Sequence, residues 1–183
     1  MIYPVVLYGH PVLRKKASEV DPETFDTEPL IANMFETMYS ASGVGLAAPQ
    51  IGKSIRLYII DASPMGEEYL ELKDFKRVFI NPEIVEHGEN LISIEEGCLS
   101  IPNINEEVKR YESITMRYLN EKFEEKEEHY EGFKAIVVQH EYDHLNGILF
   151  TDKVAPLRKR LLRSKLAAIS KGKVKTDYKI ITA

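Results

Sequence analysis

The sequence predicts an α+β fold in a single domain, residues 1–183. Two observations support this prediction. Some segments have apolar residues at helical spacing and others alternate in polarity, but they do not follow each other as the βαβ units of a parallel sheet do. The chain has 183 residues, of which 44% are hydrophobic. This length suits one domain, and a chain of this size buries about 70% of the surface that it exposes when unfolded.

The first half of the chain contains one expected helix and two expected strands. The helix covers about residues 27–41, and it runs into small residues at 42–45 that suit a tight loop. Residues 55–61 and 77–81 are expected strands because they are rich in β-branched and aromatic side chains, and the polar segment 63–68 between them is an expected loop. The apolar residues at helical spacing in the helix are Leu30, Ile31, Met34, Phe35 and Met38.

The second half adds a hairpin and two helices. Residues 113–119 alternate as a half-buried strand does, and residues 122–130 are the expected hairpin partner. A helix is expected from about residue 133 to residue 145, because Asn146-Gly147 is a typical C-terminal stop. Another helix is expected to start near Pro156, a residue that suits a first turn. Its expected apolar side consists of Leu157, Leu161, Leu162, Leu166 and Ile169.

Composition narrows the compartment and the partners. The single cysteine excludes an intrachain disulfide and predicts a reducing, cytoplasmic setting. A net charge of −5 argues against sequence-specific nucleic-acid binding. No apolar run reaches the roughly 18 residues of a membrane span, and residues 1–7 lack the basic start of a signal peptide. The basic residues within 158–165 fit a ribosome contact or, more simply, a solvated helix face.

The strongest local signal is the H-E-x-x-H pattern of His140, Glu141 and His144. Four residues advance a helix by about 400° and about 6 Å, so both imidazoles leave the same face one turn apart. Two neutral histidine nitrogens at this spacing can bind one metal ion at about 2 Å. Glu141 can lean over the open position of the metal without binding it, as a general base does. The simpler alternative is a pair of helix histidines bonded to their neighbours.

A metal site needs a third protein ligand. Cys98 is the best candidate by chemistry, because a thiolate binds zinc or iron strongly, although a lone cysteine is also commonly a buried apolar residue. Spacing alone does not choose between Cys98, Asp143 and a distant glutamate. The other histidines have no partner spacing and are expected at the surface or in hydrogen bonds; they are His10, His87 and His129.

The segment 43–52, GVGLAAPQIG, is the third candidate feature. Two closely spaced glycines followed by small residues let the backbone approach a ligand or another chain segment. The segment lacks the lysine and the serine or threonine of a phosphate loop. Gln50 supplies an amide that can donate to a carbonyl oxygen. Taken alone, the segment is more typical of a packed loop than of a catalytic one.

The three segments GVGLAAPQIG, EGCLS and QHEYDH, in this order within residues 43–144, resemble the signature motifs of peptide deformylase. The family pattern is GxGxAAxQ, EGCLS and HExxH, and agreement is complete at the specified positions. The N-terminal YGHPVLRKKA stretch is similar to the bacterial type. The resemblance implies small antiparallel or mixed sheets packed around a central helix that carries HExxH, with a C-terminal helix. It says little about the residues after Gly172, where family members vary.

The resemblance implies an activity and a cofactor. The activity is hydrolysis of the N-formyl group from the formylmethionine of nascent proteins, with release of formate, so the expected partners are N-formylmethionyl peptides. Cys98, His140 and His144 bind one divalent metal ion and leave a fourth position for water. The family uses Fe²⁺ physiologically, while Zn²⁺, Ni²⁺ or Co²⁺ can occupy the site. The metal-bound water is the nucleophile, and Glu141 acts as general acid and base.

The resemblance also assigns roles to neighbouring residues. The side-chain amide of Gln50 and the backbone N–H of Leu99 are expected to hold the negative formyl oxygen. Glu96 is expected to orient a ligand, with Arg110 as its partner.

The methionine pocket rests partly on helix geometry. Phe133, Ile136 and Val137 precede His140 by seven, four and three residues, so they share the face of the metal ligands. They are expected to form one wall, although each can equally be ordinary core. The resemblance adds the opposite side, namely Val44, Gly45 and Ile94.

Three other functions compete with this interpretation. A zinc peptidase of another family has an extended cleft and usually a histidine or glutamate as third ligand. A metal-stabilised binding module needs four protein ligands, and only three are convincing here. A cysteine hydrolase uses Cys98 as its nucleophile and does not depend on a metal.

Overall fold

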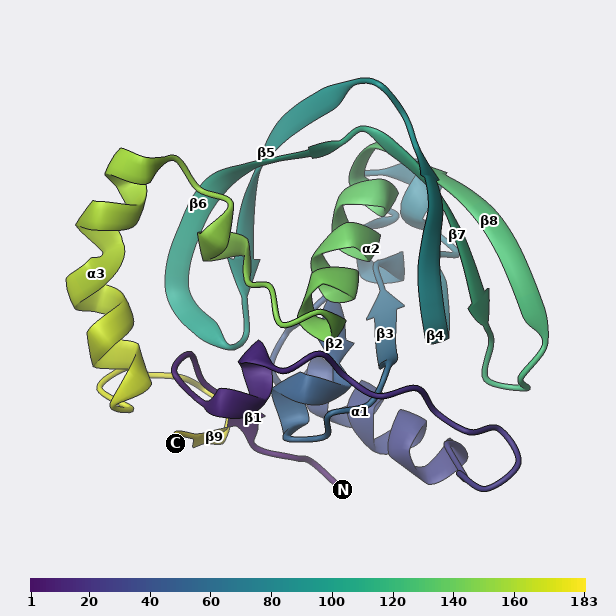
Figure 1. Cartoon of the computed structure of the whole chain (residues 1–183), viewed down its shortest axis with the longest axis horizontal. Helices are drawn as coiled ribbons and strands as arrows, with labels where there is room; N and C mark the ends of the chain where they lie inside the picture. Colours follow the sequence, from purple (N-terminus) through teal and green to yellow (C-terminus); the bar gives the residue numbers. More distant parts are fainter.

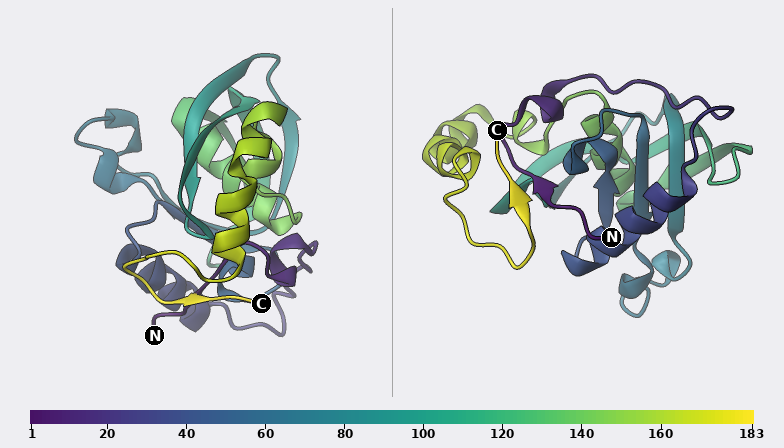
Figure 2. Two further views of the ribbon diagram at one scale, coloured as in Figure 1. Left: turned by 90° about the vertical axis from the view of Figure 1, so that its left-hand side faces the viewer. Right: turned by 90° about the horizontal axis from the view of Figure 1, so that it is seen from below.

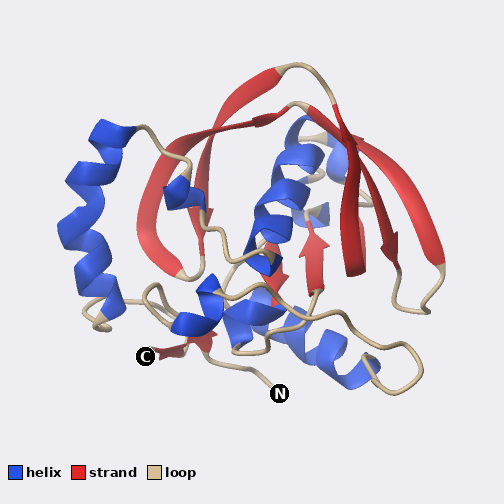
Figure 3. Ribbon diagram, in the orientation of Figure 1, coloured by secondary structure: helices blue, strands red, loops and turns tan.

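The computed structural model describes residues 1–183 and confirms the α+β fold, with helices and small antiparallel sheets (Figure 1). Three α-helices lie close to their expected positions: α1 (Glu28–Ser40), α2 (Gly132–Leu145) and α3 (Pro156–Ser170). Strands curve around α2 on two sides, and α3 lies outside them (Figure 3). None of the helices combines the length and the apolar character that crossing a membrane requires.

The largest sheet has five antiparallel strands in the order β2-β3-β4-β7-β8. Their bounds are Gly45–Ala47, Leu57–Asp61, Lys76–His87, Ser113–Leu119 and Glu125–Glu131. The hairpin of β7 and β8 was predicted, as were β3 and the first half of β4. Strand β4 continues beyond the expected end at Asn81. Asn81 has a left-handed backbone (φ 49°) and lies where the register with β7 shifts, and the pairing resumes after this irregularity.

A second hairpin consists of β5 (Leu91–Cys98) and β6 (Ile101–Tyr111). The sequence indicated only an apolar stretch before Cys98 and no strand for residues 101–111. The side chains of β6 do alternate between buried and exposed, but the buried set includes Glu106 and Arg110. Two charged residues on the inner face interrupt the apolar alternation by which a strand is recognised.

Helix α2 occupies the centre of the molecule, so most of its sides are covered. Its buried residues include Val138 and Leu145 and also polar side chains such as Gln139. The helix ends at Asn146, and Gly147 continues with a left-handed backbone (φ 72°), as the sequence predicted. Its central position lets one helix present ligands to a cavity while it packs against the five-stranded sheet.

The prediction for α3 was partly wrong. Leu162, Leu166 and Ile169 are buried, whereas Leu157 and Leu161 are 68% and 63% exposed. The three buried residues follow the i, i+4, i+7 spacing of one narrow stripe, and Leu157 and Leu161 lie on the neighbouring row that faces away from the core.

Beyond α3 the chain turns back and docks. Strand β9 (Ile180–Ile181) pairs in parallel with β1 (Val5–Val6), so the two ends of the chain lie side by side (Figure 2). Val174 and Ile180 pack against the apolar cluster that holds Leu7 and Ile101.

Candidate active site

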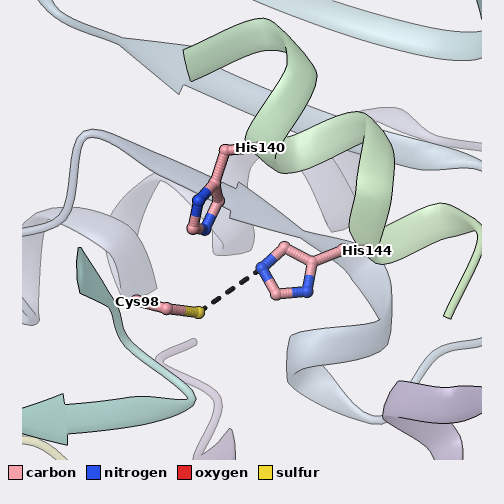
Figure 4. A group of neighbouring side chains, drawn as sticks. All are labelled: Cys98, His140 and His144. Atoms are coloured by element: carbon pink, nitrogen blue, oxygen red, sulfur yellow. Dashed lines mark hydrogen bonds between the residues drawn. The ribbon is translucent and has the colours of Figure 1, made fainter. Parts of the chain in front are cut away.

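Cys98, His140 and His144 form one cluster. Cys98 ends β5, and the two histidines lie one turn apart on α2, with all three side chains turned toward one another (Figure 4). Their potential ligand atoms lie within 4.8 Å of one another, and Cys98 Sγ is 3.4 Å from His144 Nε2. Asp143, which spacing left open as a ligand, is not part of the cluster, because its carboxylate accepts a hydrogen bond from Arg110 at 2.8 Å.

The cluster fits a tetrahedral metal ion. Ligand bonds of 2.0–2.3 Å at a tetrahedral angle separate a sulfur from a nitrogen by about 3.6 Å, close to the Cys98–His144 distance. One thiolate and two imidazoles suit zinc or ferrous iron. Glu141 Oε2 is also buried without a hydrogen-bond partner in the protein, so this oxygen is free to accept a hydrogen bond from a bound water or substrate.

A buried ion-pair network contacts His140 from the side away from the cluster. Arg110 donates to both carboxylate oxygens of Glu96 at 2.5 and 3.0 Å, and to Asp143. Glu96 Oε2 lies 3.5 Å from His140 Nδ1, which leaves His140 Nε2 for the cluster. Burial alone raises the pKa of Glu96, but its hydrogen bonds to His140 and Arg110 outweigh burial and keep the pKa below its usual value. Glu96 and Arg110 therefore lie where the resemblance implied.

Glu141 lies at the same cavity but without a cationic hydrogen-bond partner. Its side chain rests against Gly45, where any Cβ would collide with the carboxylate. Burial raises the pKa of Glu141 to about 7; the charge of His140 opposes this rise and that of Glu96 adds to it. A carboxyl group that titrates near neutrality can both accept and return a proton at neutral pH.

Gln50 is buried beside the cluster, in the short 3₁₀ turn that follows β2. Its Oε1 accepts a hydrogen bond from the Ala47 N–H at 2.8 Å, which orients the amide. Its Nε2 donates to Ser100 Oγ at 3.2 Å and to Cys98 Sγ at 3.4 Å. The Leu99 N–H donates to no other group of the chain. Both expected oxyanion donors therefore lie beside the thiolate ligand.

A cavity of about 620 Å³ opens over the cluster. Ser42 to Gly45 lie on one side, and the segments 94–99 and 101–105 also border it. All the residues expected to bind substrate line this cavity: Val44, Gly45, Ile94, Phe133, Ile136 and Val137. Phe133 and Val137 also pack against the core cluster that includes Val138, and Ile136 is buried.

Some residues of the site were missed from the sequence. Residues 175–178 line the cavity, and the Tyr178 hydroxyl donates to the Leu99 carbonyl at 2.7 Å. Burial, with the nearby Cys98 charge, raises the pKa of Tyr178 to about 12, so its phenol remains a donor. The sequence does carry a signal for this segment, because charged residues alternate with uncharged ones over residues 174–180. In the structure the uncharged residues are half-buried and the charged ones are exposed; the half-buried residues are Val174, Thr176, Tyr178 and Ile180.

The remaining histidines lie outside the cluster, as expected. His10 accepts a hydrogen bond from the Val12 N–H, and His87 stacks on Tyr111. His129 is exposed on β8.

Comparisons with known proteins agree with this site. Residues 2–160 match the family described as polypeptide deformylase. A peptide deformylase from Christiangramia forsetii is 49% identical over 187 aligned residues, which cover 98% of this chain and 95% of the relative. The crystal structure of peptide deformylase from Thermus thermophilus superposes with a TM-score of 0.83 at 41% identity, covering 94% of this chain and 99% of that chain. The peptide deformylase of Legionella pneumophila gives a TM-score of 0.81 at 39% identity, over 94% and 98% of the two chains.

The matched region includes all three motifs and both elements that supply the ligand cluster. We conclude that this chain is an enzyme of the polypeptide deformylase family.

Proposed function

We propose that this enzyme hydrolyses the N-formyl group from the formylmethionine of nascent proteins and releases formate. The observation that carries the proposal is the meeting, in one cavity, of a Cys-His-His ligand set and a buried glutamate with a pKa of about 7. Family membership supports the same reaction. Cys98, the single cysteine, is free, and this supports a reducing, cytoplasmic location. A reducing compartment keeps its thiolate available as a ligand.

Cys98, His140 and His144 would hold one divalent ion, with Fe²⁺ as the physiological metal and Zn²⁺, Ni²⁺ or Co²⁺ as substitutes. When bound, such an ion supplies a Lewis acid that lowers the pKa of a water at its open position. Glu96 and Arg110 orient His140 from behind, so that its Nε2 faces the cluster.

Glu141 performs the proton transfers. Its carboxylate accepts a proton from the attacking water and delivers it to the leaving amine. Because the pKa of Glu141 is about 7, both the protonated and the ionised forms are populated at neutral pH. Because Gly45 has no side chain, it leaves room for this carboxylate, with which any Cβ at position 45 would collide.

Gln50 and Leu99 stabilise the negative formyl oxygen. The contact of Gln50 Nε2 with Ser100 Oγ, at 3.2 Å, is longer than a usual N–H···O hydrogen bond of about 2.9 Å, and its other acceptor is the sulfur of Cys98, so a charged oxygen can compete for these N–H groups. The Leu99 N–H needs no such exchange because it has no partner in the chain. Two fixed donors beside the thiolate form an oxyanion hole.

The apolar part of the cavity takes the methionine side chain. Phe133, Ile136 and Val137 of α2 line this part of the cavity together with Val44 and Ile94. A flexible thioether fills such an irregular apolar slot well.

Formate release from a formyl-Met peptide, measured on anaerobically purified protein with and without a chelator, tests the proposal. We expect release that chelation abolishes and added metal restores. Cleavage of an internal peptide bond without deformylation would favour another zinc peptidase, and metal binding without hydrolysis would favour a binding module. Full activity after chelation would favour a cysteine hydrolase.

A ribosome contact through α3 stays a prediction. The guanidinium of Arg158 is bound to Glu106 at 2.6 and 2.9 Å, so it is less available to a partner. Lys159, Arg160 and Arg163 border a groove with Tyr8 and are the residues that would reach ribosomal RNA.

A further inference from the structure

Residues 173–183, called here the C-terminal segment, run from the end of α3 back along the cavity. Backbone hydrogen bonds from Val5 N–H to Lys179 O (2.8 Å) and from Leu7 N–H to Ile181 O (2.9 Å) anchor its end to the N-terminal strand. Asn103 Nδ2 donates to Lys175 O at 3.2 Å and anchors its start to β6. The segment is therefore fixed on both sides of Tyr178.

Tyr178 connects this segment to the active site. Its half-buried side chain lines the cavity, and its hydroxyl donates to the carbonyl of Leu99 at 2.7 Å. Within the segment, Thr176 Oγ1 donates to Tyr178 O at 2.8 Å, which fixes the tyrosine backbone. The Tyr178 hydroxyl thus connects the anchored C-terminal segment to Leu99, whose N–H is proposed to donate to the formyl oxygen.

The turn that carries Leu99 needs such support. Leu99 and Ser100 join β5 to β6 between the paired residues Cys98 and Ile101. Two-residue hairpin turns favour left-handed residues, because these match the twist of the strands. Neither Leu99 nor Ser100 has a positive φ. Negative φ suits leucine and serine themselves but matches the twist of a two-residue hairpin less well, so contacts from outside the hairpin help to fix this turn.

Three hydrogen bonds from outside the hairpin reach this turn. Gln50 Nε2 donates to Ser100 Oγ at 3.2 Å, and the Tyr8 N–H donates to Ser100 O at 2.8 Å. The Leu99 side chain packs against the core cluster that includes Met38 and Leu46, and Tyr178 supplies the hydrogen bond from outside the hairpin that acts on the Leu99 backbone. Without this hydrogen bond the Leu99 carbonyl loses its donor, and the backbone on either side of the Leu99 Cα is freer to rotate, including the peptide group that carries the Leu99 N–H.

We propose that Tyr178 is a positioning residue, whose hydroxyl holds the Leu99 backbone so that the Leu99 N–H is fixed as an oxyanion donor. This inference rests on the proposed deformylase function. It makes the C-terminal segment part of the active site, although this segment lies outside the three motifs and beyond the matched residues 2–160.

A carbonyl label reads this contact directly. Leu99-Ser100 is the only Leu-Ser pair in the sequence, so protein labelled with carbonyl-¹³C leucine and ¹⁵N serine gives one Leu-Ser cross-peak in a carbonyl-correlated NMR spectrum. In the zinc-loaded enzyme we expect this peak to move in Tyr178→Phe, which lacks only the hydroxyl. It should stay in place in the control Tyr111→Phe, because Tyr111 stacks on His87 outside the cavity.

Kinetics then test the consequence. One neutral hydrogen bond contributes about 0.5–1.5 kcal/mol, so we expect kcat for a formyl-Met peptide to fall about 2- to 12-fold in Tyr178→Phe, with KM and metal content unchanged. A cross-peak that stays in place, or one that moves while kcat is unchanged, would overturn the positioning role. If wild-type enzyme releases no formate, the proposed function fails and the positioning role fails with it, while the cross-peak still reports whether the contact exists.

Discussion

Two buried carboxyl groups in the same site have opposite pKa shifts. Glu96 receives hydrogen bonds from Arg110, and its pKa lies below the usual value even though burial works against ionisation. Glu141 has no such donor, and burial raises its pKa to about 7. The two environments therefore suit the two proposed roles: Glu96 stays ionised to orient His140, and Glu141 exchanges a proton.

The role of Glu141 predicts a large effect of a small change. Glu141→Gln keeps the shape of the side chain but cannot accept a proton. We expect metal content to stay at the wild-type level while kcat falls about 10²- to 10⁴-fold. Formate release and metal analysis on the same preparation check this expectation. A Glu141→Gln enzyme with near-normal turnover would refute the role.

Gln50 is expected to act on charge that develops during the reaction. Loss of one oxyanion donor typically lowers kcat about 10²- to 10³-fold, so Gln50→Ala should lower kcat by this amount with little change in metal content. Steady-state kinetics with a formyl-Met peptide separate the two parameters. A change in KM alone would mean that Gln50 binds ground state and transition state equally, which contradicts this assignment.

At the scale of elements, α2 was predictable within one residue, while β6 was not. The apolar residues of α2 lie on several sides of the helix, but Asn146-Gly147 marks its end in the sequence. In β6 the inner face holds Glu106 and Arg110, whose charges are compensated by Arg158 of α3 and Glu96 of β5. Such compensation depends on tertiary neighbours, so no local pattern reveals it.

The candidate site shows the same division. The spacing of His140 and His144 predicts a shared helix face, but spacing did not choose between Cys98 and Asp143, and only the motif resemblance favoured Cys98. In the structure Cys98 lies in the cluster with both histidines, whereas the Asp143 carboxylate lies outside it and is bound to Arg110. Tyr178 escaped notice because its partner, Leu99, lies 79 residues away in the chain.

The apolar face of α2 gives a prediction about substrate choice. Val137→Phe narrows the cavity, and we expect kcat/KM to fall more for formyl-Met than for formyl-Ala peptides, because each methylene in such a pocket is worth about 1–3 kcal/mol. Competition between the two peptides measures the ratio. Val85→Phe is a matched control on an exposed site of β4 outside the cavity. Equal losses on both substrates would show that Val137 serves only core packing.

At the scale of the whole molecule, the ligand cluster joins parts of the chain that fold as separate elements. Cys98 belongs to the β5–β6 hairpin, and both histidines belong to the central helix, more than 40 residues later. The hairpin pairs only with itself, while α2 packs against the five-stranded sheet. A metal ion bound to all three residues would therefore add to the ion pair between Arg110 and Asp143 in connecting the hairpin to α2.

Metal removal should consequently lower the stability of the entire chain. A ligand that binds only the folded state at 1,000 times its Kd adds about 4 kcal/mol, and 1 kcal/mol shifts Tm by about 2–4 °C at this chain length. We expect chelation to lower Tm by about 8–16 °C, as measured by differential scanning calorimetry. Cys98→Ala and His144→Ala should bind little metal, and their Tm should not respond to chelator, whereas the exposed control His129→Ala should respond as wild type does. Tight stoichiometric metal in either ligand variant would show that the ligand set is wrong. A wild-type Tm that ignores chelation despite measured metal loss would show that the metal does not hold the hairpin to α2.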